Sequence, residues 1–575
     1  MKASDYIVSF ISERGVDTVF GYIGGMITHL VDSLARSNDV KFVQTYHEQT
    51  AAIAAEGFAI ENGKFGVAIS TSGPGATNMM TGIADAYFDS IPVLYITGQV
   101  NSYEYKYDKP IRQQGFQETD IVSIVKPITK YAAFVDDAKN LRYELEKAIH
   151  IATTGRKGPV LLDIAMNVQR TDINPDELLG YKDDVNPIEE KFDLTEIVDL
   201  FSKSKRPMVL LGAGCIGDEV QKHLENFIFN HEIPVVTSLM GRGAIDETYK
   251  YYIGMVGSYG NRCANIAISQ ADLLIVLGSR LDTRQTGAKI DTFLKNGHIV
   301  HVDIDANELK YHRIHGQKNV NMDILAFLQV LNTYSYKLAS SDKWHEYVLG
   351  IKSKYNQNKE IERFVENKSP YMFIQFLNGL TKEGDVITTD VGQNQMWAAQ
   401  TIQMKKNMKF LTSGGLAPMG YSLPAAIGMA FANPNRTIYA LCGDGGFHMS
   451  VQSLMVISQY HLPIKVIVLN NSTLGMITQF QHLYFDNLMA GTTADGGYLV
   501  PDIKALAESY GLEYGVLTEN SSLEDVKRVF SASNLIEYKI SGLTTVCPKL
   551  EYNKPIESPI PLLGEEEMNY IKFKS

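Results

Sequence analysis

Two apolar runs joined by a helical pattern, residues 437–442 and 464–469, constrain the fold of this chain more than any other stretch. The first run ends at Gly443-Asp444-Gly445 and the second at Asn470-Asn471. Strand-like runs that alternate with a helix predict a βαβ unit. Sheets of this kind bind ligands beyond the carboxyl ends of their strands, so we expect Asp444 and Asn471 at one ligand-binding edge.

The residues at this edge are typical of a metal-bound phosphate site. Carboxylate and amide oxygens are the ligands that hard cations prefer, and glycines let the backbone approach a phosphate because they have no Cβ. A Gly-Asp-Gly turn alone would also fit a plain strand-to-helix connection with an exposed aspartate. The added Asn470-Asn471 pair, followed closely by Leu474-Gly475-Met476, favours the ligand site.

Composition limits the class of protein. A chain of 575 residues is too long for one core and predicts about three or four domains. A formal charge of −12 argues against a nucleic-acid surface. Neither a signal peptide nor a run of about 18 apolar residues is found, so we expect a cytoplasmic protein without a membrane span. The cysteines lie far apart and are expected to be reduced; they are Cys215, Cys263, Cys442 and Cys547.

The pattern of apolar runs predicts an α/β fold with three doubly wound parallel sheets. We expect an N-terminal domain at 1–175, a central domain at 190–335, a C-terminal domain at 365–550 and a tail at 551–575. Residues 171–192 are polar, acidic and contain proline, which is typical of a linker. Residues 336–368 are rich in lysine and glutamate and are expected to form a helical connector.

Two further stretches have more than one interpretation. Glu48 falls in the first turn of an alanine-rich helical pattern, residues 47–59, where a helix dipole alone would favour it by tenths of a kcal/mol. Residues 212–217 have the form GxGxxG after a strand, as in dinucleotide sites. The next strand ends in Val236-Thr237 without the expected acidic residue. We therefore interpret this motif as a glycine turn and do not expect a direct NAD site.

Taken together, the motifs resemble those of thiamine diphosphate enzymes of the acetolactate synthase group. The resemblance covers most of the first 485 residues. It lies in HEQTAAIAAEGFA (47–59), TSGPGATN (71–78), GRKGPVLLDIAMNVQ (155–169), GQNQMWAAQ (392–400), LTSGGLAPMGYSLPAAIGMA (411–430) and the Gly-Asp-Gly to Asn-Asn stretch.

This resemblance implies a site for thiamine diphosphate and Mg²⁺. The metal ligands would be Asp444, Asn471 and the backbone carbonyl of Thr473. Glu48 would activate the cofactor by hydrogen bonding to its aminopyrimidine ring, and Gln117 and Lys130 would be further catalytic residues. The cofactor-binding residues would be Gly392, Gln393, Asn394, Gly415, Met419, Gly443, Asp444, Gly445, Gly446, Asn471, Leu474, Gly475 and Met476.

The resemblance also implies that Glu48 meets Asp444 across a subunit interface. A homodimer would then be the smallest active unit, and a homotetramer and a regulatory subunit are left open. The central domain resembles one that binds FAD as a structural group. Its implied flavin-side residues are Arg156, Arg280, Asp282, Arg284, Asp303 and Asp305. Val256 replaces a histidine of the family motif, which leaves FAD binding open.

The implied reaction is decarboxylation of a 2-keto acid, pyruvate, followed by carboligation to a second carbonyl. The substrate side would include Gly25, Phe116, Met476 and Phe480, with Phe480 in place of a tryptophan of the family. Changes around these positions and in the tail leave a second acceptor open, such as a nucleotide-linked keto-sugar. A catalytically silent scaffold or regulatory paralogue is the alternative of another class, and the intact Glu48, Asp444 and Asn471 argue against it.

Overall fold

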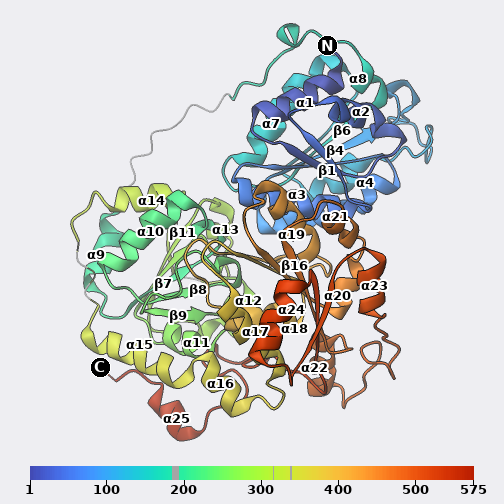
Figure 1. The fold of residues 1–575 in the computed structure, drawn as a ribbon. Coiled ribbons are helices and arrows are strands. Elements are labelled where there is room, and N and C mark those ends of the chain that lie inside the picture. Colours follow the sequence, from blue (N-terminus) through green and yellow to red (C-terminus); the bar gives the residue numbers. More distant parts are fainter. Residues whose placement is uncertain (184–192, 315, 337, 339, 575) are drawn as a thin grey trace.

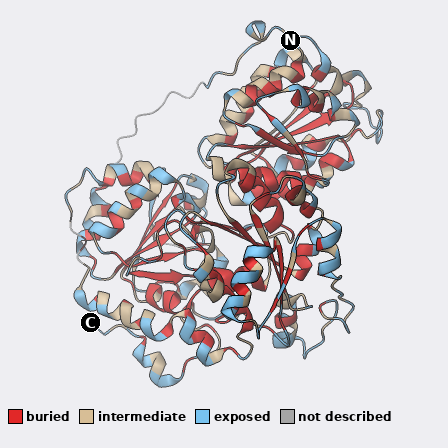
Figure 2. Ribbon diagram, viewed as in Figure 1, coloured by how far each residue is buried: buried red, intermediate tan, exposed pale blue. Residues whose placement is uncertain are grey.

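The computed structural model describes residues 1–183, 193–314, 316–336, 338 and 340–574, and these residues form three six-stranded sheets (Figure 1). Every strand pair within the three sheets is parallel. Buried strands lie between helices whose outer faces are exposed (Figure 2). The predicted three-part doubly wound α/β fold is therefore confirmed. Part of the expected linker, residues 184–192, lies outside the described residues.

The N-terminal sheet has the strand order β2-β1-β3-β4-β6-β5. Its inner strands are buried throughout because helices cover both faces. The strands are β1 (Thr18–Gly21), β2 (Lys41–Gln44), β3 (Gly66–Ser70), β4 (Val93–Gln99), β5 (Tyr131–Val135) and β6 (Val160–Ala165). The helices are α1 (Ala3–Glu13), α2 (Thr28–Arg36), α3 (Glu48–Asn62), α4 (Pro74–Asn78), α5 (Met80–Asp89), α6 (Ile121–Val125), α7 (Leu141–Thr153) and α8 (Met166–Arg170).

The central sheet has the order β12-β11-β10-β7-β8-β9. The strands are β7 (Pro207–Leu211), β8 (Val235–Thr237), β9 (Tyr252–Met255), β10 (Leu273–Leu277), β11 (His298–Asp303) and β12 (Lys318–Asn321). The helices are α9 (Thr195–Lys203), α10 (Asp218–Asn230), α11 (Arg262–Ser269), α12 (Thr283–Thr286), α13 (Ala306–Lys310) and α14 (Ile324–Leu331). Sequence patterns indicated β7, β8, β10 and β11 but missed the two edge strands. Only Val320 of β12 is buried, so that strand has no apolar run.

The C-terminal sheet has the order β14-β13-β15-β16-β18-β17. The strands are β13 (Val386–Thr389), β14 (Lys409–Leu411), β15 (Ile438–Gly443), β16 (Ile464–Asn470), β17 (Tyr514–Thr518) and β18 (Leu535–Lys539). The helices are α17 (Ser369–Leu380), α18 (Gln393–Thr401), α19 (Ser422–Ala432), α20 (Asp444–Met449), α21 (Ser453–Gln459), α22 (Gly475–Tyr484), α23 (Ile503–Ser509) and α24 (Leu523–Ala532). The predicted helix between β15 and β16 is thus two helices with a turn between them.

The connector and the tail also contain helices. As predicted, residues 336–368 are mainly helical, with α15 (Asp342–Tyr355) and α16 (Gln357–Phe364). The tail contains α25 (Glu565–Tyr570) and packs Ile556, Leu563 and Ile571 into an apolar cluster of the central domain. All four cysteines are buried and unpaired, as expected for reduced thiols.

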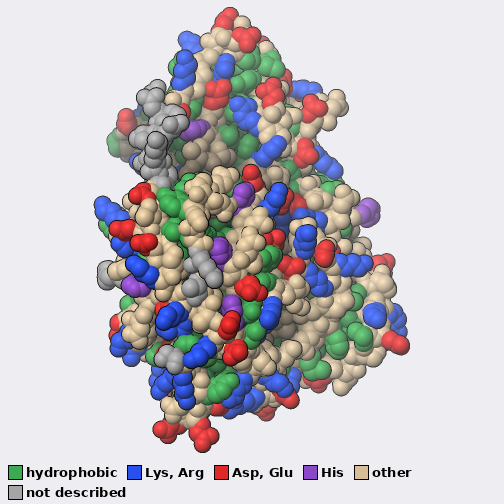
Figure 3. Space-filling model, turned by 90° about the vertical axis from the view of Figure 1, so that its left-hand side faces the viewer, with side chains coloured by type: hydrophobic (Ala, Val, Ile, Leu, Met, Phe, Trp, Pro, Cys, Tyr) green, Lys and Arg blue, Asp and Glu red, His purple; other side chains and the backbone are tan. Residues whose placement is uncertain are grey.

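Lysine and arginine side chains are interspersed with aspartate and glutamate over the face drawn in Figure 3. Among the described helices, none has the length and apolar character needed to cross a membrane.

Helices α3 and α19 join the N-terminal domain to the C-terminal domain. A Cβ on Gly57 would lie 2.2 Å from the carbonyl oxygen of Ala425, and a Cβ on Gly428 would lie 1.9 Å from that of Ala54. Only glycine permits this backbone approach. The contact fixes the direction of α3, and therefore the position of Glu48 at its first turn, relative to the C-terminal sheet.

A buried acidic cluster lies beside this contact. Glu56 of α3 is fully buried. Neither of its carboxyl oxygens has a hydrogen-bond partner among the described residues. Burial, and then the neighbouring Asp85, raise the pKa of Glu56 well above its usual value. Burial raises the pKa of Asp85 to about 7, although its Oδ1 accepts a 2.5 Å hydrogen bond from the Ser413 hydroxyl. The folded protein therefore keeps protons that the unfolded chain would release.

We expect replacement of Glu56 by glutamine to change the pH dependence of stability. In the unfolded chain, carboxyl groups lose their protons near about pH 4. Folded Glu56 and Asp85 keep their protons above that pH because their pKa values are raised. The free energy of unfolding therefore falls as the pH rises toward about 7. Each linked proton contributes about 1.4 kcal/mol per pH unit. Denaturant unfolding should show that the stability of Glu56→Gln rises relative to the wild type between acid and neutral pH. The profile of the exposed control Glu13→Gln should run parallel to that of the wild type. A Glu56→Gln profile parallel to that of the wild type would contradict the raised pKa of Glu56.

Candidate cofactor site

Asp444 lies at the carboxyl end of β15, as the sequence predicts. It is 2% exposed, and its Oδ1 accepts a 2.7 Å hydrogen bond from the Tyr498 hydroxyl. Its Oδ2 is buried and has no hydrogen-bond partner among the described residues. Burial raises the pKa of Asp444 to about 6, against the lowering effect of Tyr498. A carboxylate oxygen that is buried without a partner destabilises the fold unless a cation or donor fills the space beside it.

Asn471 lies directly after β16, the strand paired with β15, so it reaches the same edge of the sheet. Its Nδ2 donates to the Thr544 hydroxyl at 2.8 Å and to Gln393 Oε1 at 3.4 Å. Its Oδ1 accepts a 3.2 Å hydrogen bond from the backbone amide of Thr473. These contacts fix the amide so that its oxygen, rather than its nitrogen, is available to a cation.

Glycines at this edge lie where a side chain would collide with neighbouring residues. A Cβ on Gly475 would lie 2.1 Å from Gln393 Oε1. A Cβ on Gly445 would lie 2.8 Å from Leu474 Cδ2 and 3.0 Å from Met419 Cε. The structure therefore brings Gln393, Met419, Gly445, Leu474 and Gly475 together, as the resemblance implies. Gly443, Gly446 and Met476 belong to the same segments.

Gln393 and Asn394 begin α18 after Gly392, whose φ of +151° favours glycine. Gln393 Nε2 donates to the carbonyl of Thr544 at 3.0 Å and to Gln479 Oε1 at 3.2 Å. Asn394 Nδ2 donates to the carbonyl of Asp390 at 2.9 Å. The amide donors of Gln393 and Asn394 are therefore used inside the protein, and the contacts of both residues with a diphosphate stay predictions.

Gly415 lies apart from these residues. Its backbone amide donates to Asp89 Oδ1 at 2.8 Å, and the neighbouring Gly414 amide donates to Asp89 Oδ2 at the same distance. Both therefore belong to the contact between α5 and the C-terminal domain. A cofactor contact of Gly415 also stays a prediction.

Glu48 lies at the carboxyl edge of the N-terminal sheet, at the start of α3. Its Oε2 accepts a 2.9 Å hydrogen bond from Asn78 Nδ2, and a Cβ on Gly75 would lie 3.2 Å from its Oε1. Gln117, with a φ of +61°, packs against Gly73 of the same loop. In the described part of the chain, no hydrogen bond or ion pair joins Glu48 to Asp444.

The remaining predicted residues of the N-terminal domain lie in different surroundings. Phe116 is 78% exposed, and Gly25 is also exposed at the start of a short 3-10 helix. Lys130 donates from Nζ to the carbonyls of Ile151 and Thr154, and burial lowers its pKa. These carbonyls end α7, so Lys130 stabilises a helix terminus in this chain, and no hydrogen bond or ion pair of the described residues joins it to Glu48.

A cavity of about 790 Å³ lies where the three domains meet. Its wall includes Gly214 and Gly217 of the 212–217 motif, which we interpreted from the sequence as a glycine turn and not as an NAD site. Arg156 binds Asp305 at 3.1 Å and Glu308 at 2.8 Å, so its charge is neutralised by the central domain. Five of the implied flavin-side residues line the cavity, namely Arg156, Arg280, Asp282, Arg284 and Asp303. The volume is in the range of cofactor sites.

Sequence motifs missed several residues of the candidate site. Tyr498 binds Asp444 from a loop beyond α22, and no motif surrounds it. Thr544 binds both Asn471 and Gln393 from beyond β18. Asp390 accepts hydrogen bonds from the amides of Gly420 and Ser422. Only Asp390 had a sequence signal, since it is an acidic residue that directly follows the short strand-like stretch Val386–Thr389.

The fold and site together define a thiamine diphosphate enzyme. The chain matches the thiamine pyrophosphate enzyme family in three parts, namely its N-terminal TPP binding domain at residues 1–124, its central domain at 194–331 and its C-terminal TPP binding domain at 390–537. This chain belongs to that family, and its cofactor is thiamine diphosphate.

Within the family, its relatives include acetolactate synthases. The chain is 35% identical over 558 residues to the acetolactate synthase isozyme 2 large subunit of Escherichia coli, which covers 95% of this chain and 97% of that protein. It is 34% identical over 563 residues to the acetolactate synthase large subunit of Lactococcus lactis, a match that covers 96% of this chain and 94% of that protein. It is 36% identical over 538 residues to the chloroplastic acetolactate synthase of Arabidopsis thaliana, a match that covers 91% of this chain and 78% of that protein. The resemblance read from the motifs is confirmed.

Proposed function

We propose that this chain decarboxylates pyruvate and joins the remaining two-carbon unit to a second carbonyl compound, as acetolactate synthases do. The proposal rests on one observation above all. The unpartnered, buried oxygen of Asp444 and the oriented amide oxygen of Asn471 share an edge lined by glycines. Similarity to acetolactate synthases over nearly the whole chain supports this reaction and does not favour a keto-sugar acceptor or a silent scaffold.

The donor set at this edge fits Mg²⁺ that carries a diphosphate. In the described residues, no group of three or more His, Cys, Asp or Glu could hold a metal by itself. Asp444, Asn471 and the carbonyl of Thr473 would therefore share the ion with phosphate oxygens. Gln393 and the glycines 445, 446 and 475 would hold the diphosphate, with Met419, Leu474 and Met476 against the rings. Bound thiamine diphosphate supplies the nucleophilic carbon and the electron sink for decarboxylation.

A second copy of the chain would complete the site with Glu48. The contacts of Glu48 within one chain stay in its own domain, whereas its predicted role requires the cofactor ring. Two copies with the N-terminal domain of one against the C-terminal domain of the other would make two such sites. The name "large subunit" of the E. coli and L. lactis relatives supports a smaller regulatory partner as well.

The cavity between the domains is proposed to take FAD as a structural group. Its volume and the arginines 280 and 284 on its wall suit a flavin dinucleotide, whose diphosphate is anionic. Flavin absorption in the supernatant of the denatured, purified protein would support this occupant. Protein that stays colourless after incubation with FAD would contradict it.

A product analysis tests the proposed reaction. Purified protein with thiamine diphosphate, Mg²⁺ and pyruvate should release CO₂ and form acetolactate, detected by mass spectrometry. Release of CO₂ without acetolactate would direct the search to another acceptor. The absence of turnover with any 2-keto acid, despite bound cofactor, would exclude the enzymatic proposal.

Replacement of Glu48 by glutamine is expected to slow CO₂ release by about 10²- to 10⁴-fold, the usual contribution of a positioned acid or base. Glutamine keeps the size of the side chain, so the hydrogen bond with Asn78 and the binding of thiamine diphosphate should persist. Exchange of the cofactor's thiazolium proton, followed by NMR, should slow in parallel. An exchange rate equal to that of the wild type would refute the role of Glu48.

A further inference from the structure

Lys549 is a largely buried residue whose ammonium group has no anionic partner among the residues that the structure describes. It lies in the segment after the third sheet, where its backbone forms a bridge with Ile560. The residue is 7% exposed, and among the described residues its ammonium group makes no hydrogen bond and no ion pair. Burial lowers its pKa, and Glu551 opposes this effect from a distance without forming an ion pair. Its Nζ is not one of the fully buried atoms without a partner, so the ammonium group reaches solvent and is open to an anion from outside the protein.

Two aromatic rings hold the ammonium group in place. Lys549 Nζ lies 5.6 Å from the ring centroid of Phe480 and 5.4 Å from that of Tyr484, both on α22. Cation–π contacts of this length contribute about 0.5–2 kcal/mol. The rings therefore position the cation but do not replace an anion.

The segment that carries Lys549 is tied to the cofactor edge. Gln479, next to Phe480, accepts hydrogen bonds at Oε1 from Gln393 Nε2 at 3.2 Å and from the backbone amide of Val546 at 2.9 Å. Thr544 donates to Gln393 Oε1 at 2.6 Å. The chain from Thr544 to Lys549 thus begins at a cofactor residue and ends at the rings of α22.

The neighbours of Lys549 in the chain are linked by hydrogen bonds to Ser258 and Tyr259, which line the cavity between the domains. The backbone amide of Leu550 donates to the carbonyl of Ser258 at 2.6 Å, and Gln400 Nε2 donates to the carbonyls of Tyr259 and Pro548 at 2.9 Å and 3.1 Å. Tyr259 lines the cavity with Arg284, and burial raises its pKa while Arg284 lowers it. The central and C-terminal domains therefore meet at the segment that carries Lys549.

We propose that Lys549 binds an anionic group, a carboxylate or a phosphoryl group, of the second carbonyl substrate and so selects the acceptor. This inference rests on the proposed function. The acceptor is favoured over the donor for a chemical reason. The donor loses its carboxylate as CO₂, and tight binding of that group in the ground state would oppose its departure. The acceptor keeps its anion throughout the reaction.

The test compares Lys549→Met, which keeps the length of the side chain without its charge, with Lys549→Arg. Pyruvate is the donor, and the acceptors are acetaldehyde, 2-ketobutyrate and glycolaldehyde phosphate. Lys549→Met should raise KM for the anionic acceptors by about 10- to 100-fold, the value of a hydrogen bond to a charged group. KM for acetaldehyde should stay unchanged, and Lys549→Arg should restore anion selectivity. The acceptor with the larger loss identifies the carboxylate or the phosphoryl group.

Equal losses for neutral and anionic acceptors, or no loss, would overturn the inference while leaving the proposed function intact.

If the wild type releases no CO₂ from pyruvate, the proposed function fails, and calorimetric titration still decides the role of Lys549. Inorganic phosphate or oxamate should bind to the wild type and to Lys549→Arg but not to Lys549→Met. The exposed neighbour Lys554 provides a matched control, since Lys554→Met should bind like the wild type. Equal binding by Lys549→Met would refute the anion site.

Discussion

Replacing Asp444 with asparagine is expected to abolish most of the activity and, at the same time, to leave the cofactor-free protein as stable as the wild type or more so. Removing one partner of a buried ionic contact costs about 3–5 kcal/mol, which corresponds to a loss of about 10²- to 10⁴-fold in Mg²⁺-dependent turnover. Without the metal, however, Asp444 Oδ2 has no partner, and burial raises the pKa of the carboxyl to about 6. Its charge therefore destabilises the empty fold above that pH.

Thermal unfolding with and without thiamine diphosphate and Mg²⁺ separates these two effects. The wild type should unfold at a higher temperature when both are present, because ligands that bind only the folded state stabilise it. Asp444→Asn should lose this shift, whereas the exposed control Asp495→Asn should keep it. A ligand-induced shift of wild-type size in Asp444→Asn would contradict the metal role. A cofactor-free variant that unfolds well below the wild type would instead indicate a structural role.

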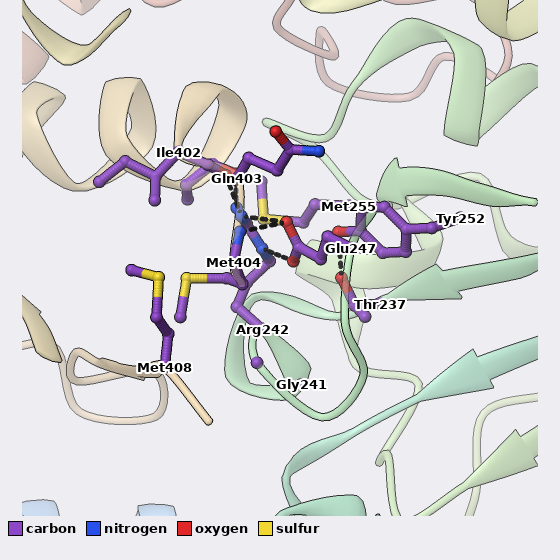
Figure 4. Close-up of polar contacts among 12 residues, drawn as sticks. Thr237, Gly241, Arg242, Glu247, Tyr252, Met255, Ile402, Gln403, Met404 and Met408 are labelled. Atoms are coloured by element: carbon purple, nitrogen blue, oxygen red, sulfur yellow. Dashed lines mark hydrogen bonds and ion pairs between the residues drawn. The ribbon is translucent and has the colours of Figure 1, made fainter. Parts of the chain in front are cut away.

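The second large effect concerns a buried ion pair of the central domain, Arg242 with Glu247, at its contact with the C-terminal domain (Figure 4). Arg242 Nε lies 2.6 Å from Glu247 Oε1, and the two side chains are 2% and 3% exposed. Arg242 also donates to the carbonyls of Ala399 and Ile402, and Glu247 Oε2 accepts a 3.0 Å hydrogen bond from the amide of Met404. Glu247→Ala leaves the guanidinium buried without its counter-ion, so the free energy of unfolding should fall by about 3–5 kcal/mol.

An exposed ion pair of the same domain is the matched control. Lys318 lies 2.8 Å from Glu196, with side chains 54% and 78% exposed. Glu196→Ala should change the free energy of unfolding by less than about 1 kcal/mol. The double variant Arg242→Met, Glu247→Leu should recover much of the loss, since apolar residues leave no buried charge. Equal denaturant midpoints for Glu247→Ala and the wild type would show that the pair does not stabilise the domain contact.

The candidate site could be read from the sequence where its chemistry is local. Gly443, Asp444 and Gly445 follow an apolar run directly, and Asn471 follows the next strand, so pairing of the two strands is enough to bring Asp444 and Asn471 to one edge. The position of Glu48 was also predictable from local sequence, and the residue lies at the first turn of α3 as expected. The assignments of Gln117, Lys130 and the flavin-side residues stay predictions.

Other parts of the site depend on segments that meet only after folding. Tyr498 reaches Asp444 from 54 residues further along the chain, and Thr544 reaches Asn471 from 73 residues further. Hydrogen bonds between loops follow from how the helices and strands pack, and loop residues show no periodicity that would predict them. The split between α20 and α21 has the same origin, because apolar spacing alone does not locate a short turn within a helical pattern.

The sequence by itself determined the three doubly wound sheets, the strand edge at which Asp444 and Asn471 lie, and the family of the enzyme. These features rest on local patterns of apolar residues, glycines and acidic or amide side chains, which adjacent strands bring together without further information. Only the tertiary structure decided that Asp444 has an unpartnered oxygen and that Lys549 lies against Phe480 and Tyr484. Burial and the presence of a partner are properties of the packed chain, because both depend on residues that are distant in sequence.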